Sequence, residues 1–121
     1  MSGRVLIVDD EFGLAEVVAE MLSERGHDVD IAINGESALA RMAEARPDLV
    51  LTDVMMPIMD GPALLGRMRA DPELATIPVI LMTAIPRSIP ASVTGMHQGL
   101  LVKPFTPAQL FAAIAALLDV G

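Results

Sequence analysis

The sequence predicts an α/β fold, a doubly wound parallel sheet of five strands with helices on both faces. Short apolar stretches suited to strands alternate five times with stretches suited to helices along the 121 residues. Short connections join these stretches, as in the repeated strand–helix units of a three-layer α/β sandwich. Right-handed crossovers place the helices on both faces of the sheet. A half-exposed second strand beside buried first and third strands favours the strand order 2-1-3-4-5.

The first half of the chain supplies three strands and two helices. Apolar residues recur at helical spacing from Leu14 to Leu22, and Gly26 ends that helix. The second strand alternates polar and apolar residues, which is typical of a half-exposed edge strand, whereas the third is apolar up to Thr52 and therefore central. We expect strands over Arg4–Val8, Asp28–Ile33 and Leu49–Thr52, and helices over Phe12–Glu24 and Glu36–Ala45.

The second half contains one segment that is poor helix material. A helix should separate the last two strands, but Pro86 and Pro90 interrupt its start and Gly95 weakens the rest. We therefore expect this fourth helix to be short, displaced or mobile. Asp60 and Thr106 are the expected N-caps of the helices on either side. The other expected elements are a helix over Gly61–Ala70, strands over Val79–Met82 and Leu100–Val102, and a helix over Pro107–Leu118.

The bulk composition excludes several classes of protein. A formal net charge of −8 argues against nucleic acid or an anionic membrane as a direct partner. No apolar run approaches the roughly 20 residues that span a bilayer, and the N-terminus leads into a strand without a secretory signal. With no cysteine, thiol catalysis and disulfides are excluded, which suits a cytoplasmic protein. We expect residues 1–121 to form one domain.

Reactive side chains stand where four of the predicted strands end. Asp9 and Asp10 follow the first strand, and Asp53, Thr83 and Lys103 follow the third, fourth and fifth. The carboxyl ends of parallel strands share one edge, and ligands of open α/β sheets bind there. We therefore expect these side chains to converge.

Three neighbouring carboxylates repel one another unless a cation neutralises them. Oxygen ligands suit a hard ion such as Mg²⁺, which takes one or two carboxylates, waters and phosphate oxygens. We expect Asp10 and Asp53 to bind the ion directly and Asp9 to act through water. The Met55 carbonyl is within reach of the same cation. The packing of Met55, Met56 and Met59 is otherwise the simpler interpretation of these methionines.

A carboxylate can also attack phosphorus and form an aspartyl phosphate. Asp53 is the candidate nucleophile because it ends a central strand. Phosphoryl transfer needs in-line positioning and positive charge on the equatorial oxygens. Mg²⁺ would hold one oxygen, the Lys103 ammonium a second, and the Thr83 hydroxyl with the Ala84 N–H the third.

Each of these residues also has a simpler interpretation. Asp9 or Asp10 could cap the first helix, Asp53 could be a turn residue, and Lys103 alone would be a solvated surface charge. The Thr83 hydroxyl could bond to nearby backbone. The joint placement at four strand ends favours the functional interpretation.

These motifs resemble the receiver domain of two-component response regulators, and the resemblance covers nearly the whole chain. It therefore implies a flavodoxin-like, CheY-like sandwich. The segments that carry it are Val5–Glu11, Asp53–Gly61, Met82–Ala84 and Lys103–Phe105.

The resemblance implies a signalling switch rather than an enzyme with an external substrate. Asp53 would accept a phosphoryl group from the phosphohistidine of a sensor histidine kinase or a histidine phosphotransfer protein. Asp10, Asp53 and the Met55 carbonyl would bind Mg²⁺ with help from Asp9, and Lys103–Pro104 would be a cis peptide. The first helix and the Pro104 loop would form the docking surface for the donor. On phosphorylation, the face formed by strand 4, helix 4 and strand 5 would change and so alter the docking of a partner.

The chain departs from the family at its output face. Receivers usually carry Tyr or Phe three residues before the lysine, where this chain has Leu100. The acidic stretch that commonly precedes it reads Gly95–Gly99 here, without a carboxylate. We therefore expect intact phosphorylation chemistry and an atypical output face.

Three rival functions fit these residues less well. A haloacid-dehalogenase-like phosphatase would carry a second Asp two residues after the nucleophile, where this chain has Met55. A flavodoxin-like FMN carrier would need a Ser/Thr-rich phosphate loop after the first strand and aromatic residues over the flavin, where this chain has acidic residues and almost no aromatics. A receiver-like adaptor would not be phosphorylated, and the complete set of site residues argues against it. The chain is either a single-domain regulator that acts by docking or the receiver of a longer protein with a tethered domain.

Overall fold

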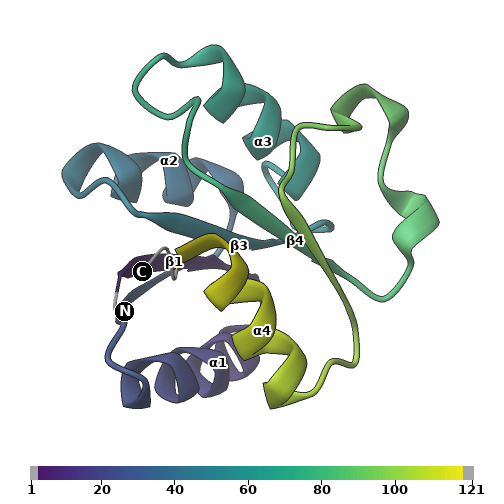
Figure 1. Ribbon diagram of the computed structural model, residues 1–121. Coiled ribbons are helices and arrows are strands. Elements are labelled where there is room, and N and C mark those ends of the chain that lie inside the picture. The colour runs from purple at the N-terminus through teal and green to yellow at the C-terminus, as the bar shows by residue number, and fades with distance from the viewer. Residues whose placement is uncertain (1–2, 119–121) are drawn as a thin grey trace.

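The computed structural model describes residues 3–118 and has the predicted architecture. Five parallel strands form one sheet in the order β2-β1-β3-β4-β5, so both the fold class and the strand order are confirmed. Helices α2 and α3 cover one face of the sheet and α1 and α4 cover the other (Figure 1). Residues 1–2 and 119–121 of the expected domain lie outside the described residues. The elements are β1 (Arg4–Val8), α1 (Phe12–Glu24), β2 (Asp28–Ala32), α2 (Gly35–Glu44), β3 (Leu49–Asp53), α3 (Gly61–Ala70), β4 (Val79–Thr83), β5 (Gly99–Val102) and α4 (Pro107–Leu118), with 3₁₀ helices η1 (Pro86–Ser88) and η2 (Ala91–Val93).

Small differences in strand length bring the reactive residues into the sheet itself. β3 and β4 each run one residue further than predicted, to Asp53 and Thr83. Asp53 pairs with Met82, and Thr83 pairs with Val102. The backbones of Asp53 and Thr83 therefore belong to the sheet and not to flexible loops. The other corrections are that β2 ends at Ala32, α2 runs one residue earlier at both ends, and β5 begins at Gly99.

The core lies on both faces of the two most buried strands. All five positions of β3 and of β4 are buried, whereas β2 is largely exposed, as predicted for a central and an edge strand. One apolar cluster packs under α2 and α3, and a second packs under α1 and α4. The sheet is therefore fixed from both sides. None of the helices within residues 3–118 has the length and hydropathy needed to cross a bilayer.

Helix starts follow the expected capping chemistry. The Asp60 side chain accepts a hydrogen bond from the N–H of Ala63 at 2.9 Å and caps α3. Thr106 Oγ1 accepts from the Gln109 N–H at 3.1 Å, while Gln109 Oε1 accepts from the Thr106 N–H at 2.8 Å. This reciprocal pair is a capping box, so both predicted caps are confirmed.

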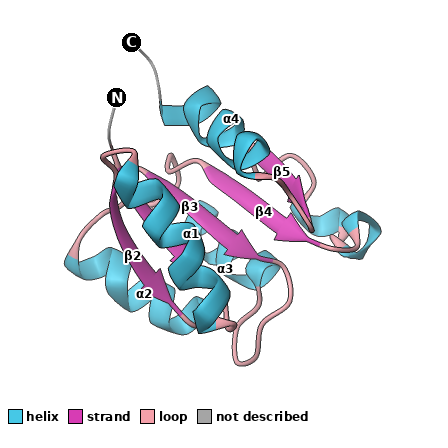
Figure 2. Ribbon diagram, turned by 90° about the horizontal axis from the view of Figure 1, so that it is seen from below, coloured by secondary structure: helices cyan, strands magenta, loops and turns pink. Residues whose placement is uncertain are grey.

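The predicted weakness of the fourth helix is confirmed, because β4 and β5 are joined by two 3₁₀ helices instead of an α-helix (Figure 2). We call residues 84–98 the connector. Pro86 begins η1, Pro90 precedes η2, and Gly95 takes a left-handed φ of 83° that ends regular structure. Val93 is 5% exposed and packs with the α2–α3 cluster, so it anchors the middle of the connector.

Arg69 of α3 ties the end of the connector to the body of the domain. Its guanidinium donates hydrogen bonds to the carbonyls of Met96, Ala75 and Ile77 at 2.9, 3.1 and 2.9 Å. It also donates to Gln98 Oε1 at 2.8 Å. One side chain thus joins α3, the loop before β4 and the residues before β5.

Candidate functional site

The predicted carboxylates converge at the carboxyl ends of the strands. Oxygen atoms of Asp9, Asp10 and Asp53 lie within 4.8 Å of one another, a geometry that could hold a metal ion. Asp9 is 4% exposed and Asp53 is 9% exposed, whereas Asp10 is exposed to solvent. Asp9 and Asp53 are therefore shielded from water, and the repulsion between their charges is stronger than it would be in solvent.

Lys103 supplies a cation to this cluster. Its Nζ lies 2.8 Å from Asp53 Oδ1 and 3.7 Å from Asp9 Oδ2. The Lys103 side chain is 26% exposed, so the ion pair is only partly screened by solvent. The Lys103–Pro104 peptide is cis, as the family resemblance implied.

Burial and neighbouring charges shift both members of this ion pair. Burial raises the pKa of Asp53 above its ordinary value, helped by the charges of Asp9 and Asp10, and the hydrogen bond from Lys103 offsets only part of the rise. Burial alone would lower the pKa of Lys103, but the hydrogen bond to Asp53 and the nearby carboxylates outweigh it and raise that pKa. The lysine is thus held in its charged form.

Asp9 also orders the start of α1. Its Oδ1 accepts a hydrogen bond from the Glu11 N–H at 2.9 Å, while Glu11 is the N-cap residue and makes no side-chain capping bond. The alternative that Asp9 caps α1 is therefore wrong, because its carboxylate bonds to the N–H of the N-cap residue and not to an N–H of the first helical turn. Its other oxygen, Oδ2, faces Lys103.

Thr83 is held by local backbone in this structure. Its Oγ1 accepts from the Ile85 N–H at 3.0 Å and donates to the Ile85 carbonyl at 3.2 Å. Ser88 Oγ lies 3.5 Å from the same hydroxyl and donates to the same carbonyl at 2.6 Å. The backbone-bonded alternative describes this state, and Ser88 is a neighbour that sequence reasoning missed. Ala84, which follows β4, is exposed.

The loop after β3 separates the three methionines. Met56 and Met59 pack against the α2–α3 cluster as expected. The packing expectation is wrong for Met55, which is 69% exposed.

An apolar hollow of about 380 Å³ adjoins the carboxylate cluster. It lies between α1 and the loop after β5, and Asp9 and Lys103 form part of its wall. The α1 side chains Leu14 and Val17 are each more than half exposed at its rim, and Pro104 and Phe105 face them.

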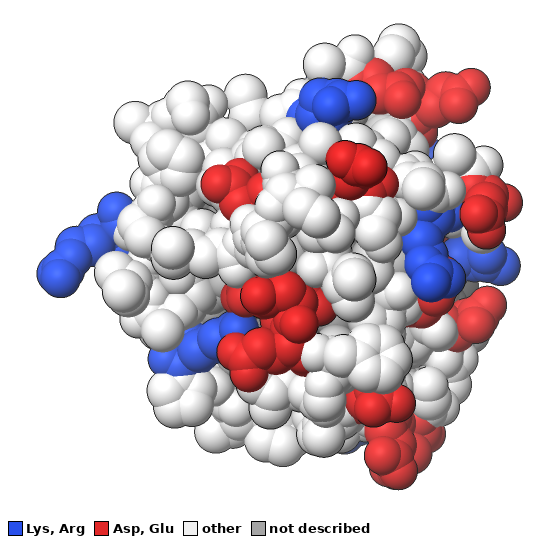
Figure 3. Space-filling view, turned by 180° about the vertical axis from the view of Figure 1, so that it is seen from behind, with Lys and Arg blue, Asp and Glu red and all other residues white. Residues whose placement is uncertain are grey.

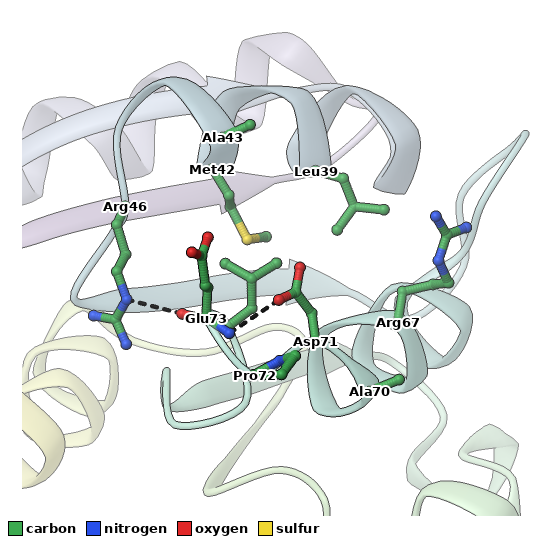
Figure 4. Close-up of a pocket in the computed structure, with 10 residues that line it drawn as sticks. Leu39, Met42, Ala43, Arg46, Arg67, Ala70, Asp71, Pro72 and Glu73 are labelled. Carbon is green, nitrogen blue, oxygen red and sulfur yellow. Dashed lines mark hydrogen bonds between the residues drawn. The ribbon is translucent and has the colours of Figure 1, made fainter.

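A larger cleft of about 650 Å³ lies elsewhere, between the C-terminal halves of α2 and α3 (Figure 4). Leu39 and Met42 line one side, and Arg46 closes an end by donating to the Glu73 carbonyl at 3.0 Å. None of the clustered carboxylates lines it. Asp9 and Lys103 line the smaller hollow instead.

A sequence model described as the response regulator receiver domain matches residues 5–115. The chain belongs to this family. The receiver resemblance drawn from the strand-end motifs is therefore confirmed.

Relatives of this receiver include two proteins named as DNA-binding regulators. It is 35% identical to the DNA-binding dual master transcriptional regulator RpaA of a Synechocystis species over 118 residues. This aligned region covers 95% of this chain and 48% of RpaA. The receiver is 36% identical over 121 residues to the DNA-binding response regulator MtrA of Mycolicibacterium paratuberculosis, covering 98% of this chain and 52% of MtrA. The chain thus spans about half the length of each.

Solved structures share the fold of this receiver. The signal receiver domain of a signal transduction histidine kinase from Syntrophus aciditrophicus matches with a TM-score of 0.88 and 35% identity, covering 97% of this chain and 90% of that one. The chemotaxis response regulator CheY4 of Vibrio cholerae matches with a TM-score of 0.88 and 29% identity, covering 98% of this chain and all of that one.

Proposed function

We propose that this receiver is a phosphorylation-dependent signalling switch in which Asp53 accepts a phosphoryl group. The donor would be the phosphohistidine of a sensor histidine kinase or a histidine phosphotransfer protein. The observation that carries the proposal is the clustering of three carboxylates with the Lys103 ammonium, whose Nζ is 2.8 Å from Asp53 Oδ1. Membership of the receiver family supports it.

The donor set at this edge fits Mg²⁺. All three clustered side chains offer carboxylate oxygens, the ligands that this hard ion prefers, and the exposed Asp10 leaves room for water. Asp10, Asp53 and the Met55 carbonyl would hold the ion directly, and Asp9 would act through water. When bound, Mg²⁺ neutralises charge on the cluster and on phosphoryl oxygens.

In the transfer step, a carboxylate oxygen of Asp53 forms a new bond to phosphorus as the bond from phosphorus to the donor histidine nitrogen breaks. The electron pair of the broken bond stays on the imidazole nitrogen. The Lys103 ammonium, held charged by its neighbours, balances the phosphoryl charge. The Thr83 hydroxyl would exchange the Ile85 carbonyl for a phosphoryl oxygen, and the Ala84 N–H would support it.

The donor would dock on the apolar hollow beside the site. Exposed Leu14 and Val17 of α1, together with Pro104, present apolar surface within the wall that contains Asp9 and Lys103. A histidine carried by a helical partner seated there would reach the carboxylates.

The output surface would consist of the connector, β4 and β5. When the Thr83 hydroxyl turns to the phosphoryl group, its hydrogen bond to the Ile85 carbonyl would break and η1 would be released. Residues 74–118 contain no Asp or Glu, although the chain as a whole has a charge of −8. Figure 3 shows acidic side chains grouped over part of one face beside a largely uncharged part. A downstream protein or tethered domain would meet this surface in the cytoplasm, without direct contact to nucleic acid.

The proposal is tested by incubating the chain with Mg²⁺ and acetyl phosphate and then measuring intact mass. We expect a gain of one phosphoryl group in the wild type and none in Asp53→Asn. Asp60→Asn is the matched control and keeps the gain, because Asp60 caps α3. An unmodified wild type, or an equal gain in Asp53→Asn, would contradict the proposal. Turnover of an external phosphate ester would instead indicate an enzyme.

A further inference from the structure

The loop between β3 and α3, residues 54–60, is fastened at both ends by glycine N–H groups. The Gly61 N–H donates to the Val54 carbonyl at 2.9 Å. The Gly35 N–H, at the start of α2, donates to the Met59 carbonyl at 2.9 Å. The loop is therefore held between the N-termini of two helices.

Gly61 leaves no room for a side chain. A Cβ there would overlap the Asp53 carbonyl oxygen and lie 3.0 Å from Val54 Cα. Both neighbours are main-chain atoms, so the overlap can be relieved only by moving the backbone of Asp53 and Val54 or by shifting α3. The φ of Gly61 is outside the left-handed region, and alanine at this position is therefore limited by space and not by conformation.

Gly35 has the same relation to the other end of the loop. A Cβ there would lie 2.6 Å from Met59 Cγ and 2.8 Å from the Met59 carbonyl oxygen. Between the two fastened ends, Ile58 has a φ of 69° and is 77% exposed. This conformation is unfavourable for a β-branched residue and persists only where its surroundings impose it.

We propose that Gly61, supported by Gly35, is a positioning residue for the phosphoacceptor site. The absence of a side chain lets α3 sit directly on the Asp53–Val54 peptide. That contact fixes the direction of the Asp53 carboxylate and of the next carbonyl in the metal set, that of Met55. This inference rests on the proposed function, because it assigns a role toward the same carboxylates.

Gly61→Ala tests the proposal, and Gly66→Ala in the same helix is the matched control because a Cβ there meets nothing within 4 Å. The first measurement is Mg²⁺ binding to the unphosphorylated chain by calorimetry. We expect Gly61→Ala to bind about tenfold more weakly, as is typical when a group that orients metal ligands is disturbed. The rate of phosphorylation by acetyl phosphate at saturating Mg²⁺ should fall as well. Gly66→Ala should match the wild type in both.

Asp60→Ala separates positioning from helix stability. It removes the cap of α3 without placing an atom against Asp53, so it should lower the melting temperature and leave Mg²⁺ affinity unchanged. Weaker Mg²⁺ binding in Gly61→Ala and Gly35→Ala but not in Asp60→Ala supports the proposal. Wild-type affinity in Gly61→Ala, or an equal loss in Asp60→Ala, overturns it.

Two further outcomes are distinguishable. If the wild type neither binds Mg²⁺ nor gains a phosphoryl group, the proposed function fails together with this inference. If the wild type does both and Gly61→Ala behaves like Gly66→Ala, only the positioning role fails. Should Gly61→Ala not fold alone, it is made in the Gly66→Ala background, and a chain that remains unfolded there overturns the proposal in favour of a purely structural contact.

Discussion

The charged form of Asp53 is favoured by Lys103 and disfavoured by burial and by the neighbouring carboxylates. Lys103 lies 2.8 Å away, but burial and two further carboxylates disfavour its charge, and its pKa is raised. A raised pKa means that the folded chain binds this proton more tightly than the unfolded chain. The stability that the group contributes is therefore greatest below its ordinary pKa of 3.8 and is lost as pH rises through the folded value.

This sign leads to a prediction for Asp53→Asn. At neutral pH without Mg²⁺, we expect the variant to melt a few degrees above the wild type, because it removes a buried charge that the fold disfavours. The difference should shrink as the pH falls toward 3.8, because the folded wild-type carboxyl, whose pKa is raised, takes up its proton above that value. Calorimetric melts across this pH range measure it. A variant that melts below the wild type at neutral pH would show that the Lys103 hydrogen bond dominates instead.

In the proposed function, Lys103 would compete with Mg²⁺ for the same carboxylates and would also balance the charge of the transferred phosphoryl group. We expect Lys103→Met to bind Mg²⁺ more tightly, since one positive charge is gone, and to be phosphorylated about 100-fold more slowly, the usual cost of removing one charge-stabilising donor. Lys103→Arg is the control that retains the charge. Calorimetry and the time course with acetyl phosphate give the two values. Weaker Mg²⁺ binding in Lys103→Met would argue against a shared site.

The position of each reactive residue could be predicted because each follows an apolar strand. The specific partners of the Thr83 hydroxyl could not be predicted, although bonding to nearby backbone is one interpretation. Ile85 and Ser88 lie at the start and end of η1, and no sequence periodicity encodes the geometry of this turn. Likewise, the sequence marks Gly61 only as a helix start. Its contact with the Asp53 carbonyl emerges when α3 docks on the end of β3.

The connector shows what composition does and does not predict for an element. Two prolines and a glycine indicate a poor helix, and two 3₁₀ helices form. The anchor of the connector could not be predicted, because Arg69 lies 27 residues from Met96 in the chain and meets it only through the fold. With few regular backbone bonds, the connector depends on this side chain.

Arg69→Met should therefore loosen the connector. We expect a loss of about 2 kcal/mol in the free energy of unfolding, close to the worth of one hydrogen bond to a charged group, about 1.5–3 kcal/mol. The partners of the four lost bonds are part-buried or exposed, so water replaces most of these bonds. Amide exchange at residues 96–98 should rise more than exchange in β3. Arg67→Met on the same helix is the control. Unchanged exchange at residues 96–98 would contradict the anchoring role.

The described residues divide into an acidic part and a part that has no Asp or Glu. All carboxylates of the described chain lie before residue 74, including the three at the site, and residues 74–118 supply Lys103, the connector and β5. The three clustered carboxylates and the proposed output surface therefore come from different parts of the sequence and meet where β3 and β4 end. Thr83 joins the connector to the lysine of the site, because its Oγ1 accepts from the Ile85 N–H and its carbonyl accepts from the Lys103 N–H at 2.9 Å.

Mg²⁺ should stabilise the whole fold, because at the proposed site it would bind the assembled carboxylates and not the unfolded chain. At a free concentration 100 times its dissociation constant, the free energy of unfolding should rise by about 2.7 kcal/mol. EDTA should reverse the change, and Asp10→Asn should reduce it. Denaturant melts at matched ionic strength measure the effect. An equal rise in Asp10→Asn would place the ion elsewhere.

The most direct test of the account locates the phosphoryl group on the chain. The protein is incubated with Mg²⁺ and acetyl phosphate, treated with borohydride, which reduces an acyl phosphate to an alcohol, and digested for peptide mass spectrometry. We predict homoserine at position 53 and at no other acidic residue. Homoserine at Asp9 or Asp10, or none in a chain that has gained a phosphoryl group, would contradict the assignment of Asp53 as the acceptor.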